Sequence, residues 1–398
     1  MSHKPMRISF FNYHYDIEGT ARGAAVQIRS IAEALQMLGH EVDLHFRAAR
    51  KPGRERAYGG MKKIPWLRRY ANVPRLILRN FHFYREECRL IAEFRPDVVL
   101  AAHSYCNLSA VTAARRCGVP CVVLAETPME YEYSMFFTPF YSYPVLGRWL
   151  EGMNIRSASQ VICISEILKG YMMRYAVPAT RLHVIPNGVD HHLIRPVPPD
   201  EDLRHRFGLT HRRVVGFVGT FQFFGNVDAT MEIIEKVCGE MKDVVFLFVG
   251  EGEAGKCLRD KGERMGLGEH LLFTGAVTHE EVPSFLSVMD VVFASYRGDY
   301  LFYGSPMKLL EYMAAGKAVL GTALGQIKEL IVDGYNGMLF EWGDNATMYR
   351  KLLSLLQDPA LRRKLGDNAR KTIEENWTWE IQASHIVEVL QKALGAKP

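Results

Sequence analysis

Short apolar runs alternate with longer amphipathic segments through the first half of the chain. The segment after Gly23 repeats apolar residues three or four apart on one face, and Gly39 follows as an expected helix stop. The runs are short and rich in β-branched residues, which favours buried strands. Strand, helix and strand in this order predict right-handed crossovers and a parallel sheet. The predicted strands cover residues 8–11, 42–46, 98–101, 122–124 and 161–164.

The second half repeats this pattern, with predicted strands at residues 214–218, 244–249, 271–273, 291–293 and 318–320. Between the halves, several prolines follow Asn187-Gly188 and predict a boundary near residues 187–200. We therefore expect an α/β protein with two facing, Rossmann-like, doubly wound parallel-sheet domains at residues 1–190 and 200–377. Ligands bind such sheets outside the carboxyl ends of the strands, so facing domains direct them to the interdomain cleft.

A final amphipathic helix is predicted over residues 378–396. Its apolar residues recur at helical spacing from Trp379 to Leu394. The pattern alone fits a helix that packs on the second domain as well as one that returns to the first domain.

Length and composition agree with a two-domain globular protein. The 398 residues are 48% hydrophobic and 23% charged, and single cores rarely grow beyond about 250–300 residues. No apolar run approaches the roughly 18 residues of a membrane-spanning helix, and residues 1–7 do not resemble a signal peptide. Seven scattered cysteines favour reduced thiols. We therefore expect a cytoplasmic protein, at most associated with the inner face of the membrane.

The net charge of +5 hides an uneven distribution. Residues 1–190 contain 25 Lys and Arg against 16 Asp and Glu, a net charge of +9, whereas residues 191–398 contain 24 against 28, a net charge of −4. Residues 47–89 alone hold 13 basic residues and three Glu, interleaved with apolar and aromatic residues. This basic segment predicts either a peripheral membrane surface or helices with solvated charges. No nucleic-acid-binding motif accompanies it, so nucleic acid is disfavoured as a partner.

Glycines stand at several predicted strand-to-helix turns, including Gly219, Gly250 and Gly304. A turn glycine lets backbone N–H groups approach an anion at a helix N-terminus, although glycine is common in such turns for structural reasons as well. None of them forms a strict dinucleotide-binding or Walker A motif, which disfavours NAD or P-loop chemistry.

A sharper pattern follows Gly304. Pro306 predicts the start of a helix that places Lys308 in its first turn, where the helix dipole prefers an anion. A cation there is favourable if a phosphate lies against it. Glu311, one turn later, can accept hydrogen bonds from the hydroxyls of a ribose. The alternative is a solvated Lys308 and a locally paired Glu311.

Taken together and in order, several motifs resemble the family-4 retaining glycosyltransferases. The resemblance covers nearly the whole chain. The motifs that carry it are Arg22-Gly23-Ala24-Ala25-Val26, Asn187-Gly188-Val189-Asp190, Val249-Gly250-Glu251-Gly252, Phe273-Thr274-Gly275, Ser305-Pro306-Met307-Lys308, Glu311-Tyr312-Met313-Ala314-Ala315-Gly316-Lys317, Gly325-Gln326-Ile327 and Trp377-Thr378-Trp379-Glu380.

This resemblance implies a GT-B fold, a UDP- or GDP-sugar held mainly by the second domain, a glycan or lipid-linked acceptor held by the first, and neither a metal nor a cofactor. It also favours a return of the final helix to the first domain. Lys308 matches a catalytic cation at the diphosphate. The implied donor-binding residues are Gly219, Thr220, Gly250, Gly275, Gly304, Ser305, Met307 and Glu311.

Three positions depart from the family pattern. Tyr303 stands where a glutamate usually contacts the donor sugar, and Asp299 is only a loose substitute. Thr220 replaces a phosphate-binding arginine, and Phe224 replaces its companion lysine. Lys308 therefore becomes the leading candidate for neutralising the diphosphate.

On the acceptor side, the resemblance matches Gly23 to a loop near the donor phosphate and the acceptor. Glu126 stands where many members have a histidine, and it is the second catalytic candidate because a carboxylate there would accept a hydrogen bond from a sugar hydroxyl. His103 follows the predicted strand 98–101 and is a second candidate for the acceptor site. The alternatives are a surface glutamate and a structural histidine.

We expect, on this basis, a metal-independent, retaining hexosyltransferase that moves a sugar from a nucleotide-sugar donor to a hydroxyl acceptor in cell-surface glycan or glycoconjugate synthesis. A nucleotide-sugar epimerase or hydrolase of the same fold is one alternative. A non-catalytic nucleotide-sugar-binding protein is another, because the usual arginine and glutamate are replaced at Thr220 and Tyr303.

Overall fold

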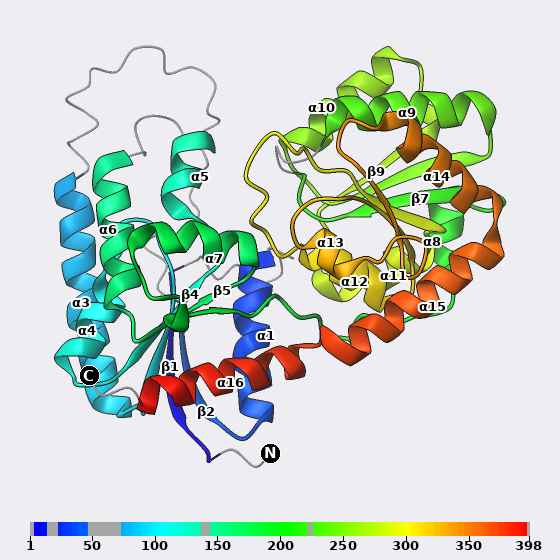
Figure 1. Cartoon of the computed structure of the whole chain (residues 1–398). Coiled ribbons are helices and arrows are strands. Elements are labelled where there is room, and N and C mark those ends of the chain that lie inside the picture. Colours follow the sequence, from blue (N-terminus) through cyan, green and yellow to red (C-terminus); the bar gives the residue numbers. More distant parts are fainter. Residues whose placement is uncertain (1–3, 14–22, 47–72, 137–143, 222–225, 396–398) are drawn as a thin grey trace. The chain divides into compact units, whose positions relative to one another are not determined.

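Two separately packed units make up the chain (Figure 1). The computed structural model describes residues 4–13, 23–46, 73–136, 144–221 and 226–395. The first unit comprises Met1–Asp16, Gln27–Pro186 and Gln382–Pro398. The second comprises Ile17–Val26 and Asn187–Ile381.

Six parallel strands form the sheet of the first unit, in the order β2-β1-β3-β4-β5-β6. Strand β1 lies between β2 and β3, so the order of the strands reverses on either side of it. The strands match those predicted for the first half, with the addition of the three-residue β6. Their bounds are β1 (Arg7–Asn12), β2 (Glu41–Phe46), β3 (Val98–Ala102), β4 (Cys121–Ala125), β5 (Gln160–Cys163) and β6 (Leu182–Val184).

Helices cover this sheet. Helix α1 (Gly23–Met37) ends as predicted, because Gly39 adopts a φ of +87° and donates its N–H to Gln36 O, at 2.9 Å. The helices of the first unit are α1 (Gly23–Met37), α3 (Val73–Phe94), α4 (Ser109–Arg116), α5 (Met129–Phe136), α6 (Pro144–Ser157), α7 (Glu166–Met172), η1 (Met173–Tyr175) and η2 (Ala179–Arg181).

The second unit contains another six-stranded parallel sheet, in the order β12-β11-β10-β7-β8-β9. The order reverses between β10 and β7, the crossover point at which doubly wound sheets bind ligands. The short β12 was not predicted. The strands are β7 (Arg213–Val218), β8 (Val244–Val249), β9 (Leu271–Gly275), β10 (Val291–Ala294), β11 (Ala318–Thr322) and β12 (Met338–Phe340).

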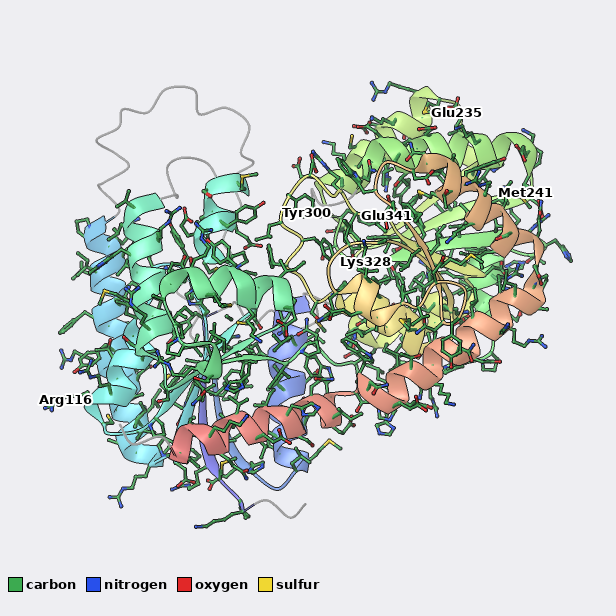
Figure 2. The ribbon with its side chains drawn as sticks, in the orientation of Figure 1. Arg116, Glu235, Met241, Tyr300, Lys328 and Glu341 are labelled. Carbon is green, nitrogen blue, oxygen red and sulfur yellow. The ribbon has the colours of Figure 1, made fainter. Side chains whose placement is uncertain are left out.

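Helices cover both faces of the second sheet, and their side chains fill the space between helix and sheet (Figure 2). An ion pair at the rim, between Lys328 Nζ and Glu341 Oε1, spans 3.5 Å (Figure 2). The helices of the second unit are α8 (Glu201–Arg206), α9 (Val227–Glu240), α10 (Glu253–Arg264), η3 (Gly268–His270), η4 (His279–Glu281), α11 (Val282–Ser287), α12 (Met307–Ala314), α13 (Ile327–Leu330), α14 (Asn345–Gln357) and α15 (Pro359–Asn376). They are followed by α16 (Trp379–Gly395), which only starts in this unit.

Strand β8 shows why a continuous apolar run forms a central strand. All six of its residues are buried. Val245, Leu247 and Val249 belong to the core on one face, whereas Val244, Phe246 and Phe248 belong to the core on the other. Because successive side chains point to opposite faces, a strand covered on both sides needs apolar residues at every position.

The final helix α16 begins in the second unit, and its residues from Gln382 onward belong to the first. All seven cysteines are free thiols. None of the described helices combines the length and the apolar character that a membrane span requires.

Candidate active site

The crossover point of the second sheet carries the predicted donor-site residues. Strands β7 and β10 pair at Val215↔Val291 and Gly216↔Val292 but separate toward their carboxyl ends. The phenol of Tyr312 fills this gap. Its hydroxyl accepts a hydrogen bond from Val218 N at 2.6 Å and donates one to Val218 O at 2.9 Å. Helix α12 is thereby fixed beside the end of β7.

Lys308 lies one turn before Tyr312, so its side chain also reaches the end of β7. Its Nζ is 4.3 Å from the ring centre of Phe217 and 5.7 Å from that of Tyr296. Among the described residues, no hydrogen-bond acceptor or ion-pair partner contacts this ammonium. Burial lowers the pKa of Lys308 to about 8, and the carboxylate of Glu311 opposes the shift.

Gly219 follows β7 and leaves room for Lys308. A Cβ at this glycine would lie 3.2 Å from Lys308 Cε, and its φ of +138° is itself unfavourable for other residues. The glycine is thus needed both for the backbone conformation and for the approach of the lysine side chain.

Backbone hydrogen bonds join the glycine-containing ends of β7, β8 and β9 to one another. Gly219 N donates to Val249 O at 2.9 Å, and Gly250 N donates to Gly275 O at 2.8 Å. A Cβ on Gly250 would lie only 2.1 Å from Gly219 O. A Cβ on Gly252 would lie only 2.1 Å from Phe221 O. Close loop packing therefore accounts for Gly250 and Gly252 without a ligand. Gly304, by contrast, has open space where a Cβ would stand.

Glu311 projects from α12 and pairs with His279, which begins η4. The distance between His279 Nε2 and Glu311 Oε1 is 2.9 Å, and the two side chains are 19% and 14% exposed. Burial disfavours the charged imidazole, but the hydrogen bond and charge of Glu311, with smaller contributions from Glu280 and Asp190, raise the pKa of His279 above its ordinary value. This histidine was not predicted as a site residue.

Ser305 and Thr220 differ sharply in their surroundings. The buried Ser305 Oγ accepts a hydrogen bond from Asn187 N at 3.0 Å, and Asn187 Nδ2 donates to Ser305 O at 2.9 Å. Thr220 is exposed, and Met307, the first residue of α12, is half-buried. Ser305 therefore anchors the loop before α12 to the start of the second unit.

The positions that depart from the family pattern supply no substitute carboxylate at the loop before α12. Tyr303 is buried, with 7% of its surface exposed. Asp299 is exposed, and its Oδ1 accepts a hydrogen bond from Arg297 Nε at 3.0 Å. The guanidinium of Arg297 lowers the pKa of Asp299, so its carboxylate is engaged locally. Phe224 lies outside the described residues.

The candidate acceptor residues lie at the carboxyl ends of neighbouring strands in the first unit. His103 follows β3 and is buried, and its Nε2 is 3.0 Å from Oε1 of the equally buried Glu151. Glu151 also accepts hydrogen bonds from Tyr175 Oη at 2.7 Å and from the backbone N–H groups that open α5. Glu126 follows β4 and is buried, and Gly23 is the first residue of α1.

This network explains the ionisation of Glu151. Burial alone would favour the neutral acid, yet the hydrogen bond and charge of His103, together with the hydroxyl of Tyr175, hold the pKa of Glu151 below its ordinary value. His103 is thus integrated into the core of the first unit, whereas His279 stands beside the predicted donor site.

Comparison with known proteins places this geometry in a family. An uncharacterised glycosyltransferase of Methanocaldococcus jannaschii, MJ1069, is 23% identical over 67% of this chain and 66% of its own length. A GDP-mannose-dependent phosphatidylinositol monomannoside mannosyltransferase of Mycolicibacterium smegmatis is 26% identical over 70% of this chain and 72% of its own. The model of Glycosyltransferase Family 4 matches residues 21–193, and that of the Glycosyl transferases group 1 matches residues 212–358. The chain belongs to the family-4 glycosyltransferases.

Solved glycosyltransferases share the fold. Sucrose-phosphate synthase of Thermosynechococcus elongatus superposes with a TM-score of 0.75 over 98% of this chain and 99% of its own, at 19% identity. HepE of Anabaena, solved in complex with UDP, gives a TM-score of 0.71 over 97% of this chain and 100% of its own, at 18% identity. The glycosyltransferase described here therefore has the GT-B fold, as expected from its sequence motifs.

Proposed function

We propose that this glycosyltransferase transfers a hexose from a nucleoside-diphosphate sugar to a hydroxyl acceptor, without a metal ion and with retention of the anomeric configuration. The observation that carries the proposal is the ammonium of Lys308. It lies at the crossover point of the second sheet, over two aromatic rings, with all three N–H donors free of partners among the described residues. A partly buried cation of this kind is stabilised by an anion, and a diphosphate supplies one.

The leaving-group chemistry follows from this placement. As the bond between the anomeric carbon and the β-phosphate oxygen breaks, negative charge grows on that phosphate. Lys308 and the unpaired N–H groups at the start of α12 would stabilise the charge in the role that a divalent cation has in other enzymes. The acceptor oxygen forms the new bond to the anomeric carbon on the same face, and its proton passes to the departing phosphate.

The pair formed by Glu311 and His279 supports binding of a ribose. The hydrogen bond and charge of Glu311 raise the pKa of His279, which favours an imidazolium beside the carboxylate. Only one oxygen of that carboxylate is bound by His279, so the other can accept a ribose hydroxyl. HepE was solved with UDP and with UDP-glucose, whereas the Mycolicibacterium relative is named for GDP-mannose, so both nucleotides belong in a donor screen.

The proposal is tested by incubating the purified chain with a panel of UDP- and GDP-sugars and with glycan or lipid-linked acceptors, in EDTA. Nucleotide release that requires an acceptor and persists in EDTA is expected, and NMR of the product should show the anomer of the donor. Loss of activity in EDTA, restored by Mg²⁺, would contradict metal independence. Conversion of the nucleotide sugar without an acceptor would favour an epimerase or hydrolase. Tight binding of the nucleotide sugar without turnover would favour a binding protein.

A lipid-linked acceptor in cell-surface glycan synthesis is the acceptor class that the first unit supports best. Residues 47–72 of the basic segment lie outside the described residues, but residues 73–89 belong to α3. This helix exposes Ile77, Leu78 and Phe81, at 64%, 66% and 56% of their surfaces, and Arg85 lies 5.9 Å from the ring centre of Phe81. Large exposed apolar side chains beside arginines are typical of surfaces that lie on anionic membranes.

Helix α6 extends this surface. It exposes Val145 and Trp149, at 85% and 56%. Side chains of α3, α5 and α6 pack around one small core at Tyr105 and Met129, so these three helices lie together (Figure 1). Their exposed apolar residues therefore lie on neighbouring helices of the first unit. The Mycolicibacterium relative, whose name gives a phosphatidylinositol mannoside as acceptor, is consistent with such an arrangement.

Vesicle flotation tests the membrane contact. The chain should float with vesicles that contain phosphatidylglycerol, less well at high salt, and not with phosphatidylcholine alone. Replacing Phe81 and Trp149 with serine should abolish flotation, whereas Met265→Ser, at an exposed apolar residue of the second unit, should not. Flotation that is indifferent to anionic lipid, or unchanged in the double variant, would leave a soluble acceptor as the better hypothesis.

A further inference from the structure

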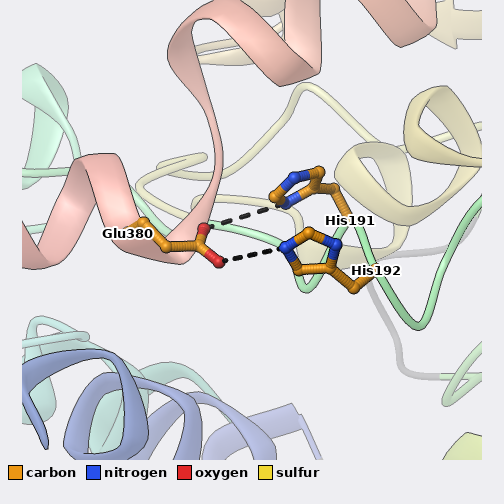
Figure 3. Close-up of side chains that lie close together, drawn as sticks. All are labelled: His191, His192 and Glu380. Carbon is orange, nitrogen blue, oxygen red and sulfur yellow. Dashed lines mark ion pairs between the residues drawn. The ribbon is translucent and has the colours of Figure 1, made fainter. Parts of the chain in front are cut away.

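Two histidines and one glutamate from distant parts of the sequence meet where the second unit begins and ends. His191 and His192 stand shortly after the start of this unit, and Glu380 lies in the first turn of α16 (Figure 3). One potential ligand atom from each of the three residues lies within 4.8 Å of the other two. This cluster uses none of the side chains proposed above to bind the donor.

The backbone brings these segments together. Val189 N donates to Trp377 O at 3.0 Å, and Trp379 N donates to Val189 O at 3.3 Å, which forms an isolated bridge between Val189 and Thr378. Gly188 makes this approach possible, because a Cβ there would lie 2.8 Å from Trp379 N. The bridge thus sets the start of α16 beside the two histidines.

The turn that carries the histidines is also held in place. Asp190 Oδ1 accepts hydrogen bonds from His192 N at 3.0 Å and from Leu193 N at 2.9 Å. Arg370, from α15, donates from Nη2 to His191 O at 3.0 Å. Little backbone ordering therefore remains to be done when the side chains bind a ligand, which lowers the entropic cost of binding.

The distances between side chains fit a bound ion better than direct hydrogen bonds. His191 Nδ1 is 3.7 Å from Glu380 Oε2, and His192 Nε2 is 3.8 Å from Glu380 Oε1 (Figure 3). Both distances exceed hydrogen-bond length. Tetrahedral zinc with ligands at about 2.0–2.1 Å separates neighbouring ligand atoms by about 3.3 Å, whereas the three ligand atoms here lie within 4.8 Å of one another, so side-chain rotations that bring them up to about 1.5 Å closer would form the site.

The side chains have room for that closure. The two imidazole ring centres lie 4.0 Å apart. His192 is 73% exposed, so its ring can rotate, and water can complete the coordination. His191 Nδ1 is a buried atom without a hydrogen-bond partner among the described residues, as a nitrogen that awaits a ligand would be.

We propose that His191, His192 and Glu380 bind a transition-metal ion of the zinc class, with water in the remaining positions. Two imidazole nitrogens and one carboxylate oxygen suit Zn²⁺, Co²⁺ or Ni²⁺, whereas Mg²⁺ and Ca²⁺ prefer all-oxygen sites. The ion would tie the turn after Asp190 to the first turn of α16 and stabilise the point where the chain enters and leaves the second unit. It is a structural ion, separate from the metal-independent transfer proposed above.

The experiment uses the full chain without an affinity tag, stripped of metal and titrated with Zn²⁺ in a calorimeter. We expect one Zn²⁺ per chain with a dissociation constant in the micromolar range or below, a rise in Tm of about 2–4 °C at saturation, and no comparable binding of Mg²⁺. Co²⁺ should give the visible absorption bands of a low-symmetry site. Absence of Zn²⁺ binding, or equal affinity for Mg²⁺, would overturn the proposal.

Three variants locate the site. His192→Ala and Glu380→Gln should each weaken Zn²⁺ binding at least tenfold and remove the rise in Tm, while Tm without metal stays close to that of the parent chain because both side chains are partly exposed. His205→Ala, at an exposed histidine of α8, is the matched control and should leave Zn²⁺ binding unchanged. Equal affinity in all three variants would place the ion elsewhere and refute the assignment.

Discussion

The two ends of helix α12 each carry a partly buried lysine, in opposite surroundings. Lys317, just beyond the carboxyl end, donates from Nζ to Ser287 O at 3.1 Å and to Met289 O at 2.9 Å. Lys308, in the first turn, faces the rings of Phe217 and Tyr296 and has no such acceptor among the described residues. Burial lowers the pKa of both lysines to about 8.

The pKa alone therefore does not distinguish a binding lysine from a structural one. Lys317 uses two of its three N–H donors on carbonyl oxygens at the end of α11, where a cation complements the helix dipole. Lys308 stands at a helix N-terminus, where a cation is unfavourable until an anion arrives. What separates the two lysines is the unfilled donor capacity of Lys308, and each prediction below tests that difference.

The largest expected effect is on turnover. Lys308→Ala removes the cation that we propose faces the departing phosphate and should lower kcat by about 10²–10³-fold. The thermal unfolding curve should hardly move, because the side chain makes no hydrogen bond to the described residues. Steady-state kinetics with the donor identified in the screen, together with calorimetric Tm, makes the measurement. Parent-level turnover in this variant would end the phosphate assignment.

The second effect is on stability. Lys317→Met keeps the packing of the side chain but leaves Ser287 O and Met289 O without their donor, and should lower the free energy of unfolding by about 1–2 kcal/mol. Urea denaturation measures this difference, and kcat should stay unchanged. Lys236→Met is the matched control, since that lysine is exposed on α9 and bonds to Glu232 alone within the part of the chain that the structure describes. A loss of turnover in Lys317→Met would erase the distinction between the two ends of α12.

The fold was largely predictable because the central strands are buried on both faces. Runs such as Val244–Val249 must be apolar at every position, and this pattern is visible in the sequence. The strands that were missed, β6 and β12, have three residues each and are only partly buried. Their pairing depends on the neighbouring strand rather than on their own composition.

The candidate donor site was predictable only in part. Lys308 and Glu311 lie on one predicted helix at a spacing that local reasoning can interpret. His279 lies 32 residues from Glu311 in a three-residue helix, and only the topology of the sheet brings it to the carboxylate. Gly250 was predicted as a donor-binding residue, and the structure supplies a simpler reason for it in the approach of the Gly219 carbonyl. A glycine pattern alone does not separate ligand binding from loop packing.

A smaller effect, on nucleotide affinity, is expected for Glu311 of α12. Glu311→Gln keeps the shape of the side chain but removes the charge that pairs with His279 and accepts from the ribose, so nucleotide affinity should fall about tenfold. Isothermal titration with UDP and GDP measures the change. The same substitution at Glu151, which pairs with His103 in the first unit, should lower stability and leave nucleotide affinity intact. Equal affinity in Glu311→Gln and the parent chain would remove Glu311 from the site.

The smallest effect is a dependence of nucleotide affinity on pH. The pKa of Lys308 is about 8, below its ordinary value, so above pH 8 the free protein loses the proton that a diphosphate requires. Affinity for UDP or GDP should be constant from pH 7 to 8 and then fall, by no more than tenfold per pH unit. Lys308→Arg should flatten the profile, because a guanidinium stays protonated across this range.

Lys317→Met separates the two lysines in the same titration. Lys317 also has a pKa of about 8, but its proton is held by carbonyl oxygens of the protein and not by the ligand. The variant should therefore keep the fall in affinity that Lys308→Arg loses. A profile that flattens in Lys317→Met and persists in Lys308→Arg would reverse the roles assigned to the two ends of α12, because it would make the carbonyl-bound lysine the one that meets the diphosphate.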